Sequence, residues 1–367
     1  MPLTGLRVID ASTVVAGPGC ARHLADFGAD VVKVEHPSGD GVRRMGFIHP
    51  DGDALYWKVL NRGKRTIALD LKDPADLATM RRLCASADVL VENFRPGTLE
   101  RLGLAPAELL AANPRLVITR ITGFGQDGPY AGRPGFATIA EAMSGFAALN
   151  GEPEGAPLLP PIALTDEITA MAAAFATMVA LRSGVGQVVD VNLLESLFQV
   201  MGPLISAYEV LGYLQPRLGS GIPYSVPRGT FQTRDGRWVA ISTSAESVAQ
   251  RVMQLIGVGD DERFATFEGR IAHRDDVNAA VAAWIGARDE VEVLGAFEDA
   301  HAAIAPIMDM AAISADAHYR ARGAITEVDD VPMQGLVARL SATPGHIRHG
   351  ARGIDADRDD IIAELDT

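Results

Sequence analysis

Short apolar runs rich in β-branched residues alternate with longer segments of helical periodicity along roughly the first 200 residues. Strands buried on both faces of a sheet are short and apolar, whereas the covering helices repeat their apolar positions about every 3.6 residues. The strands predicted in this way are residues 6–10, 29–35, 65–71, 88–93, 116–122 and 188–191. One predicted helix passes through residue 23 and ends at residue 26. The others occupy residues 74–87, 106–112 and 168–181. Strands that alternate with helices indicate parallel βαβ units, so we expect an α/β fold with a doubly wound open parallel sheet.

The composition of the sequence changes near residue 201, which predicts that the large domain ends there and that separate segments follow. Residues 1–200 are expected to form the large α/β domain, and the Gly-, Pro- and Ser-rich residues 201–230 a linker. A small α+β domain is predicted for residues 231–322, opening with a hairpin that turns at residues 234–236. Residues 323–367 are expected to return to the large domain.

Composition and charge narrow the class of protein. The 367 residues are 48% hydrophobic and carry a net charge of -14, which argues against nucleic acid as a partner because a phosphate backbone needs a basic surface. Two cysteines are too few for a disulfide framework. The N-terminus lacks the pattern of a signal peptide, and no uncharged apolar run reaches about 18 residues. We therefore expect a cytoplasmic protein without a membrane span.

Several kinds of site find little support in the sequence. No Gly-x-Ser-x-Gly motif is present, and neither cysteine lies in a recognisable catalytic setting. His346 and His349 have no carboxylate at ligand spacing, so we expect no metal site there. A Gly-Pro-Gly turn at residues 17–19 follows the first strand, but Arg22 stands where a dinucleotide fingerprint needs its third glycine.

Asp166 is the carboxylate in the most unusual position. It follows an apolar, proline-interrupted stretch at residues 158–164 and opens an almost wholly apolar helical segment, which we expect to be buried. Position alone favours a structural interpretation, because an acid in the first turn complements the helix dipole and either Asp166 or Thr165 could cap the helix. Glu167 adds a second acid at the same place.

Ordered sequence blocks around this acid change the interpretation. They are GLRVIDAS (5–12), AGPGCARHLADFGADVVKVEHPSGD (16–40), NRGKRTIALDLKDP (61–74), ADVLVENFRPGTLERLGL (87–104), ITGFGQDGPYAGRPGF (121–136), AMSG (142–145) and LTD (164–166). In order and spacing, over nearly the whole length, the chain resembles the class III CoA-transferases, the group that includes formyl-CoA transferase and carnitine CoA-transferase.

The resemblance implies a function and a set of site residues. Asp166 is the residue that matches the family's nucleophile, which exchanges CoA through aspartyl anhydride and aspartyl-CoA intermediates; the N-terminus of its helix is expected to stabilise the developing charge. CoA would be a substrate, with no tightly bound cofactor, and a small carboxylic acid the other partner. The implied CoA contacts are Val15, Ala16, His36, Leu69, Lys72, Asn93, Phe94, Arg95, Arg101, Gly135, Phe136 and Ala137. The family also implies a homodimer of two interlocked ring-like chains.

Two alternatives stay open. The related 2-methylacyl-CoA racemases need a His as second acid–base group, and Phe136 stands in its place here. A non-catalytic CoA-binding relative is the other alternative. Ala137 replaces an acid of many relatives, and residues 219–224 replace a four-glycine loop, so oxalate or formate specificity is not implied. Tyr224 and Arg228 are candidate contacts to the acid, Glu141 could support the site, and donor and acceptor stay unknown.

Overall fold

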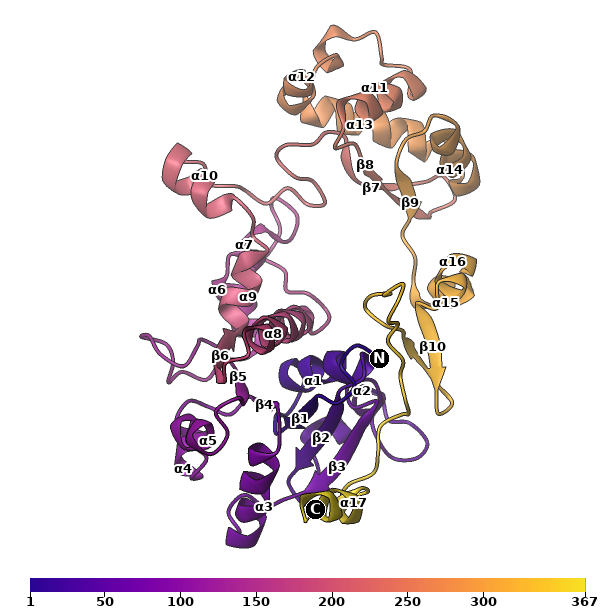
Figure 1. The fold of residues 1–367 in the computed structure, drawn as a ribbon. Coiled ribbons are helices and arrows are strands. Elements are labelled where there is room, and N and C mark those ends of the chain that lie inside the picture. The colour runs from indigo at the N-terminus through magenta and orange to yellow at the C-terminus, as the bar shows by residue number, and fades with distance from the viewer. Residues whose placement is uncertain (367) are drawn as a thin grey trace. The chain divides into compact units, whose positions relative to one another are not determined.

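A computed structural model of the chain describes residues 1–366, and its largest element is a six-stranded sheet (Figure 1). The strand order is β3-β2-β1-β4-β5-β6, and every neighbouring pair is parallel. The strands are β1 (Arg7–Asp10), β2 (Asp30–Glu35), β3 (Lys64–Ala68), β4 (Val89–Glu92), β5 (Val117–Thr122) and β6 (Gln187–Asn192). The predicted parallel sheet is confirmed, and its order reverses between β1 and β4, where open α/β sheets bind ligands.

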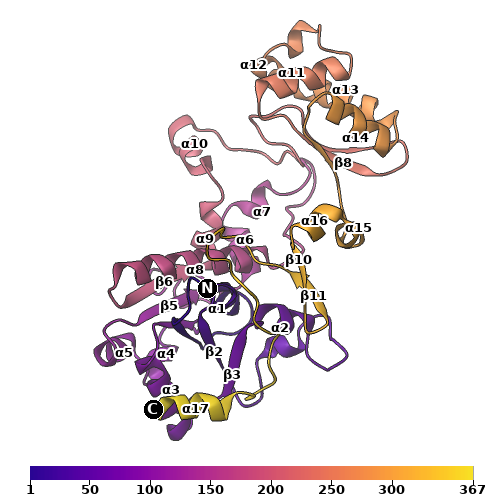
Figure 2. The ribbon, with the colours of Figure 1, turned by 45° about the vertical axis from the view of Figure 1, so that its right-hand side comes forward.

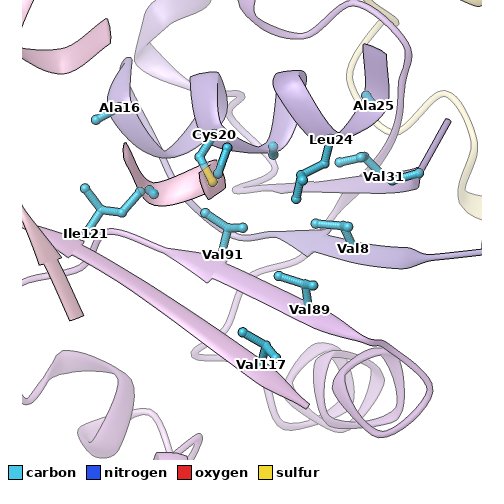
Figure 3. Packing of buried hydrophobic residues seen from close by; sticks show 14 of the residues in the cluster. Val8, Ala16, Cys20, Leu24, Ala25, Val31, Val89, Val91, Val117 and Ile121 are labelled. Carbon is cyan, nitrogen blue, oxygen red and sulfur yellow. The ribbon is translucent and has the colours of Figure 1, made fainter. Parts of the chain in front are cut away.

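Helices cover both faces of this sheet. On one face lie α1 (Ala16–Asp26) and α8 (Leu164–Ser183), and on the other α3 (Pro74–Ala85), α5 (Pro106–Ala112) and α17 (Arg358–Leu365). Successive strand residues alternate between these two cores, so Val8 packs toward α1 whereas Ile9 packs toward α3. Figure 3 shows Cys20 and Leu24 of α1 pointing toward the valines of the sheet.

The glycines near residue 17 do not form the predicted turn. They lie in the first turn of α1, which already begins at Ala16, with Pro18 where a helix needs no backbone N–H. A Cβ at Gly17 would come within 2.2 Å of Ser12 Cβ, and one at Gly19 within 2.9 Å of Ala170 Cβ. Gly17 is therefore needed for close packing of α1 on the loop after β1, and Gly19 for close packing of α1 on α8.

Helix α8 is buried on one face only, contrary to the expectation from its composition. Thr169, Ala173 and Thr177 are buried, whereas Met171 and Phe175 are 44% and 73% exposed. By length and hydropathy it is the one helix among residues 1–366 that could cross a membrane. Because it packs along α1 and begins with two acids, we interpret it as a core helix.

The chain divides into two compact units with boundaries that differ from the predicted ones. The first contains residues 1–146, 159–202 and 317–367, and the second residues 147–158 and 203–316. Residues 147–158 were expected in the large domain, but Arg217 donates to the carbonyls of Glu152 and Gly155 and so holds this stretch in the second unit. The expected linker also contains helix α10 (Leu204–Leu211).

The second unit is an antiparallel sheet covered by helices. Its strands are β7 (Arg228–Gln232), β8 (Trp238–Ser242) and β9 (Ile304–Pro306), and the predicted hairpin between β7 and β8 is confirmed. Helices α11 (Glu246–Leu255), α12 (Phe267–Ala272), α13 (Arg274–Gly286) and α14 (Glu290–Asp299) accompany this sheet.

The C-terminal segment, from residue 317, belongs to the first unit. It forms the hairpin β10 (Ile325–Val328) and β11 (Val331–Gln334), and α17 then lies beside β3 (Figure 2). The Thr66 N–H donates to Asp357 Oδ2 at 2.9 Å, which ties this helix to the sheet edge. The remaining helices are η1 (Gly41–Arg44), α2 (Leu55–Leu60), α4 (Thr98–Arg101), α6 (Ala137–Met143), α7 (Phe146–Leu149), α9 (Leu193–Gln199), η2 (Glu262–Phe264), α15 (Met310–Ala315) and α16 (Ala317–Ala321).

Candidate active site

Asp166 is the third residue of α8 and does not cap it. Ala163 occupies the N-cap position, without a side-chain hydrogen bond, and Thr165 is fully buried. The Thr165 hydroxyl instead donates to Glu141 Oε1 of α6 at 2.9 Å. The capping interpretation is therefore wrong for both residues, because the helix begins at Leu164, four residues before the apolar segment predicted from residue 168.

The surroundings of Asp166 disfavour its negative charge. Burial, followed by the charges of Glu167 and Glu141, raises the pKa of Asp166 to about 6. The expected benefit of the helix N-terminus is thus outweighed, since burial penalises the ionised form and two further acids lie close by. The carboxylate is still mostly ionised at pH 7, and a half-buried acid with a shifted pKa is typical of catalytic sites.

Residues distant in sequence complete the neighbourhood of Asp166. Burial and the charges of Glu167 and Asp166 raise the pKa of Tyr56 on α2. Glu167 accepts a hydrogen bond from Arg22 of α1 at 3.2 Å. The sequence carries no signal for Arg22 or Tyr56, because their partners lie more than one hundred residues away and follow from the packing of three helices. Glu141, expected only as a possible support, is a buried member of the site.

A pocket of about 330 Å³ lies at the carboxyl ends of the central strands, where the strand order reverses. Four of the predicted CoA contacts line it, one or more from the end of each of three strands: His36, Leu69, Lys72 and Phe94. Leu69 is buried and Lys72 is exposed, and the lining also includes the acids Glu35, Asp40 and Asp70, so the pocket joins an apolar floor to a charged rim on which Lys72 is the cation. That combination suits a nucleotide, whose base is apolar on its faces and whose phosphates are anionic.

His36 and Asn93 are both positioned by backbone bonds. The Ser38 N–H donates to His36 Nδ1 at 3.1 Å, so a neutral His36 carries its proton on Nε2. Asn93 accepts from the Thr13 N–H at 2.8 Å and donates to the Thr13 carbonyl at 2.7 Å. Its side chain therefore joins the loop after β1 to the loop after β4, and both loops border the pocket.

The remaining predicted CoA contacts, in the loop after β1 and after β4, differ in exposure. Val15 and Ala16 are 2% and 5% exposed at the start of α1. The preceding Val14 has φ of +65°, a strained value for a β-branched residue that is often associated with functional loops. Arg95 and Arg101 are exposed, and Arg101 donates to Thr98 Oγ1 at 2.7 Å.

Three further predicted CoA contacts, Gly135, Phe136 and Ala137, lie where the chain enters α6, the helix that carries Glu141. A Cβ at Gly135 would lie 2.7 Å from the Gly123 Cα, so only glycine permits these two backbones to touch. Phe136, at the racemase His position, is 67% exposed. This stretch is thereby connected to Asp166 through the bond between Glu141 and Thr165.

Two predicted acid contacts lie in the second unit. Tyr224 is 58% exposed, and Arg228 begins β7 and lines a pocket of about 180 Å³ together with residues 219–221, part of the segment that replaces a four-glycine loop. Among residues 1–366, no group of three or more His, Cys, Asp or Glu side chains could hold a metal ion. His346 and His349 border a separate pocket of the first unit.

Comparison with known proteins agrees with the residues described above. The chain is 39% identical over 381 aligned residues to the beta subunit of succinyl-CoA–L-malate CoA-transferase of Chloroflexus aurantiacus, covering all of this chain and 94% of that one. It is 35% identical to succinate–glutarate CoA-transferase of Agrobacterium fabrum, over 100% and 96% of the two chains. A crystal structure of a CAIB/BAIF family protein from Brucella suis superposes with a TM-score of 0.89 at 33% identity, covering 100% and 99%. Residues 3–358 match the model of CoA-transferase family III, and the chain belongs to that family.

Proposed function

We propose that this CoA-transferase moves CoA from an acyl-CoA donor to a free carboxylic acid with Asp166 as nucleophile. The observation that carries the proposal is the half-buried Asp166 carboxylate, held among Glu141, Glu167 and Tyr56 with its pKa raised to about 6. The named relatives act on succinyl-CoA, L-malate or glutarate, so we propose dicarboxylic acids as the substrate class.

The reaction is proposed to proceed by covalent exchange at this carboxylate. An Asp166 oxygen attacks the thioester carbonyl, the C–S bond breaks, and CoA leaves as a thiolate, which gives a mixed anhydride. The thiolate then attacks the Asp166 carbonyl of that anhydride and releases the donor's carboxylate, leaving an aspartyl-CoA thioester. The acceptor acid repeats both steps in reverse order, so that Asp166 returns to a free carboxylate.

The elevated pKa suits this chemistry. A carboxylate of higher pKa is the stronger nucleophile once it is ionised, and the neighbouring acids disfavour its free charge but not its acylated, neutral form. The pocket at the ends of β1 to β4 is proposed to bind the nucleotide part of CoA, with His36, Lys72, Arg95 and Arg101 as the groups that meet its phosphates.

The pH profile should report the ionisation of Asp166. We expect kcat/KM for CoA transfer to rise with pH and level off above about 6, because only the ionised carboxylate attacks. Replacing Glu167 by glutamine removes a nearby negative charge and should move this acid limb to lower pH. Glu108→Gln, an exposed change on the opposite face of the sheet, should leave the limb in place. A profile that Glu167→Gln does not move would contradict the assignment.

A panel of acids tests the function and separates it from racemisation. CoA transfer from succinyl-CoA to succinate, malate, glutarate and monocarboxylates is followed by mass spectrometry, and we expect transfer to at least one diacid. Incubation of a 2-methylacyl-CoA in D₂O should give no deuterium at the α-carbon, because Phe136 supplies no acid–base group. Deuterium incorporation without CoA exchange would reinstate the racemase, and neither reaction would favour a non-catalytic relative.

A homodimer is proposed from the apolar surface of each unit. Phe175 and Val179 on α8 are 73% and 56% exposed, and α10 of the second unit has no buried residue although it is mostly apolar. Contiguous exposed apolar residues of this kind mark interaction surfaces. The interlocked arrangement is an expectation from the family resemblance.

A further inference from the structure

A cavity of about 530 Å³ opens beside the first turn of α8, wholly within the first unit. Its volume falls in the range of about 300–1,000 Å³ that is usual for small-molecule sites. Apolar walls come from α2, from α8 and from the segment after β11, including Val59, Leu164, Met171 and Leu336. The polar residues of the lining are Arg22, His23, Tyr56, Arg62, Glu167 and Gln334.

Arg22 is the cation of the lining that retains a buried N–H donor without a hydrogen-bond partner. Its side chain is more than nine-tenths buried, and its Nε–H has no hydrogen-bond partner. The two bonds found for its guanidinium both come from Nη2, one to Glu167 Oε2 and one to His23 Nε2, each at 3.2 Å. A guanidinium prefers to hold a carboxylate through two parallel N–H donors, and Glu167 uses only one.

His23 adds a second unused donor. Burial, followed by the positive charges of Arg22, Arg62 and Lys64, lowers the pKa of His23 to about 3, so the ring is neutral. Since Arg22 can only donate, His23 Nε2 must accept and the proton must lie on Nδ1. That Nδ1 is buried without a partner. A buried donor without a partner costs about 1–3 kcal/mol, so this pair is poised to gain from an anionic ligand.

Arg62, the second guanidinium of the cavity, by contrast uses four of its five N–H donors within the protein. It donates to both carboxylate oxygens of Asp26 at 3.1 and 2.7 Å, and also to the carbonyls of Gln334 and Gly335. It therefore serves the fold, and Arg22 is the cation of the cavity that can take up a further anion.

We propose that this cavity receives the acyl chain of the substrate and that Arg22 binds the second carboxylate of a dicarboxylic acid or of its CoA thioester. The entering carboxylate would replace Glu167, the residue directly after Asp166, as the hydrogen-bond acceptor of Arg22. Asp166 does not itself line the cavity, but its neighbour Glu167 does, as does Tyr56, whose pKa is raised by burial and by the charges of Glu167 and Asp166. The reacting end of the substrate is proposed to reach Asp166 past Tyr56. The inference rests on the proposed function, and it makes Arg22 the residue that selects diacids.

The test compares two donors that differ only at the far end of the acyl chain. Succinyl-CoA ends in a carboxylate and butyryl-CoA in a methyl group. Arg22→Met should lower kcat/KM for succinyl-CoA about 10- to 100-fold more than that for butyryl-CoA, given the usual strength of a charged hydrogen bond. Arg22→Lys keeps the charge and should lie between. Arg182→Met, which removes an exposed charge at the other end of α8, should change neither donor.

A binding measurement separates this inference from the proposed function. By calorimetric titration, succinate should bind the wild-type protein and should bind Arg22→Met at least about 10-fold more weakly, whereas butyrate should not distinguish the two. Equal losses for both donors, or equal succinate binding by both proteins, would overturn the role of Arg22. Normal succinate binding without any CoA transfer would instead count against the transferase proposal and leave Arg22 as a dicarboxylate ligand.

Discussion

Replacing Asp166 by asparagine is expected to lower kcat for CoA transfer by about 10,000-fold or more, since loss of a covalent nucleophile removes the reaction path itself. Binding of CoA, followed by calorimetry, should change little, because the pocket proposed for the nucleotide is built from the loops after β1 to β4. Asp360 provides a matched control: it is also the third residue of its helix, α17, and it is exposed. Asp360→Asn should retain full activity.

The same substitution should make the protein more stable. Burial and the neighbouring acids raise the pKa of Asp166 above its unfolded value of 3.8 to about 6, so its charge opposes folding at pH 7. Asp166→Asn should therefore add about 1–3 kcal/mol to the free energy of unfolding at neutral pH. The gain should shrink as pH falls from about 6 toward 3.8, where the native aspartate becomes neutral. Thermal unfolding across this range measures it, and a loss of both activity and stability would indicate a structural role.

Replacing Asp10 by asparagine should cause the largest loss of stability. Asp10 is fully buried at the end of β1, where Lys64 Nζ donates to it at 2.8 Å and Lys33 Nζ lies at 3.9 Å. Burial acts to raise the pKa of Asp10, but the two ammonium groups outweigh it and hold the pKa below its usual value. Without this carboxylate, the buried Lys64 loses its ion pair and the buried Lys33 keeps only that with Asp40, so we expect a loss of about 3–5 kcal/mol in urea unfolding.

Asp30→Asn is the control for that change. Asp30 begins the adjacent strand and pairs with Arg65 at 2.6 Å, but its side chain is 35% exposed, so we expect a loss of about 1 kcal/mol or less. The contribution of Asp10 should be complete at neutral pH and should disappear as pH falls through its lowered pKa, because protonation breaks the pairs with both lysines. Equal losses of unfolding free energy for the two variants would show that the buried ion cluster around Asp10 stabilises the fold no more than the partly exposed pair of Asp30 and Arg65.

The sheet could be predicted from the sequence because its strands are buried on both faces. Val8 and Ile9 are both fully buried, on opposite faces, so consecutive positions in the middle of such a strand are apolar and form a recognisable run. The unit boundaries could not be predicted, because residues 147–158 join the second unit only through bonds to Arg217 and Gly219 far along the chain.

The candidate site was predictable in part for a similar reason. Family resemblance implied Asp166 and the contacts His36, Leu69, Lys72 and Phe94. These four contacts share one pocket because parallel strands bring their carboxyl ends to one edge. Arg22 carries no local signal: it lies within an ordinary helix, and its contact with Glu167 arises only when α1 packs on α8. Nor does the sequence show whether charge near Asp166 is favoured or disfavoured, because that depends on burial and on Glu141 from a third helix.

Oxygen labelling tests the role of Asp166 most directly. The acceptor acid is supplied with both carboxylate oxygens as ¹⁸O and turned over with succinyl-CoA, and the peptide that contains Asp166 is then analysed by mass spectrometry. In the proposed mechanism an acceptor oxygen bridges the anhydride, and it stays on the aspartate when CoA thiolate attacks the acceptor carbonyl. We predict one ¹⁸O in the Asp166 carboxylate after a single turnover and two after many, because each turnover replaces one aspartate oxygen with one from the acceptor. Turnover without label in Asp166, or with the label in Glu167 instead, would contradict the account.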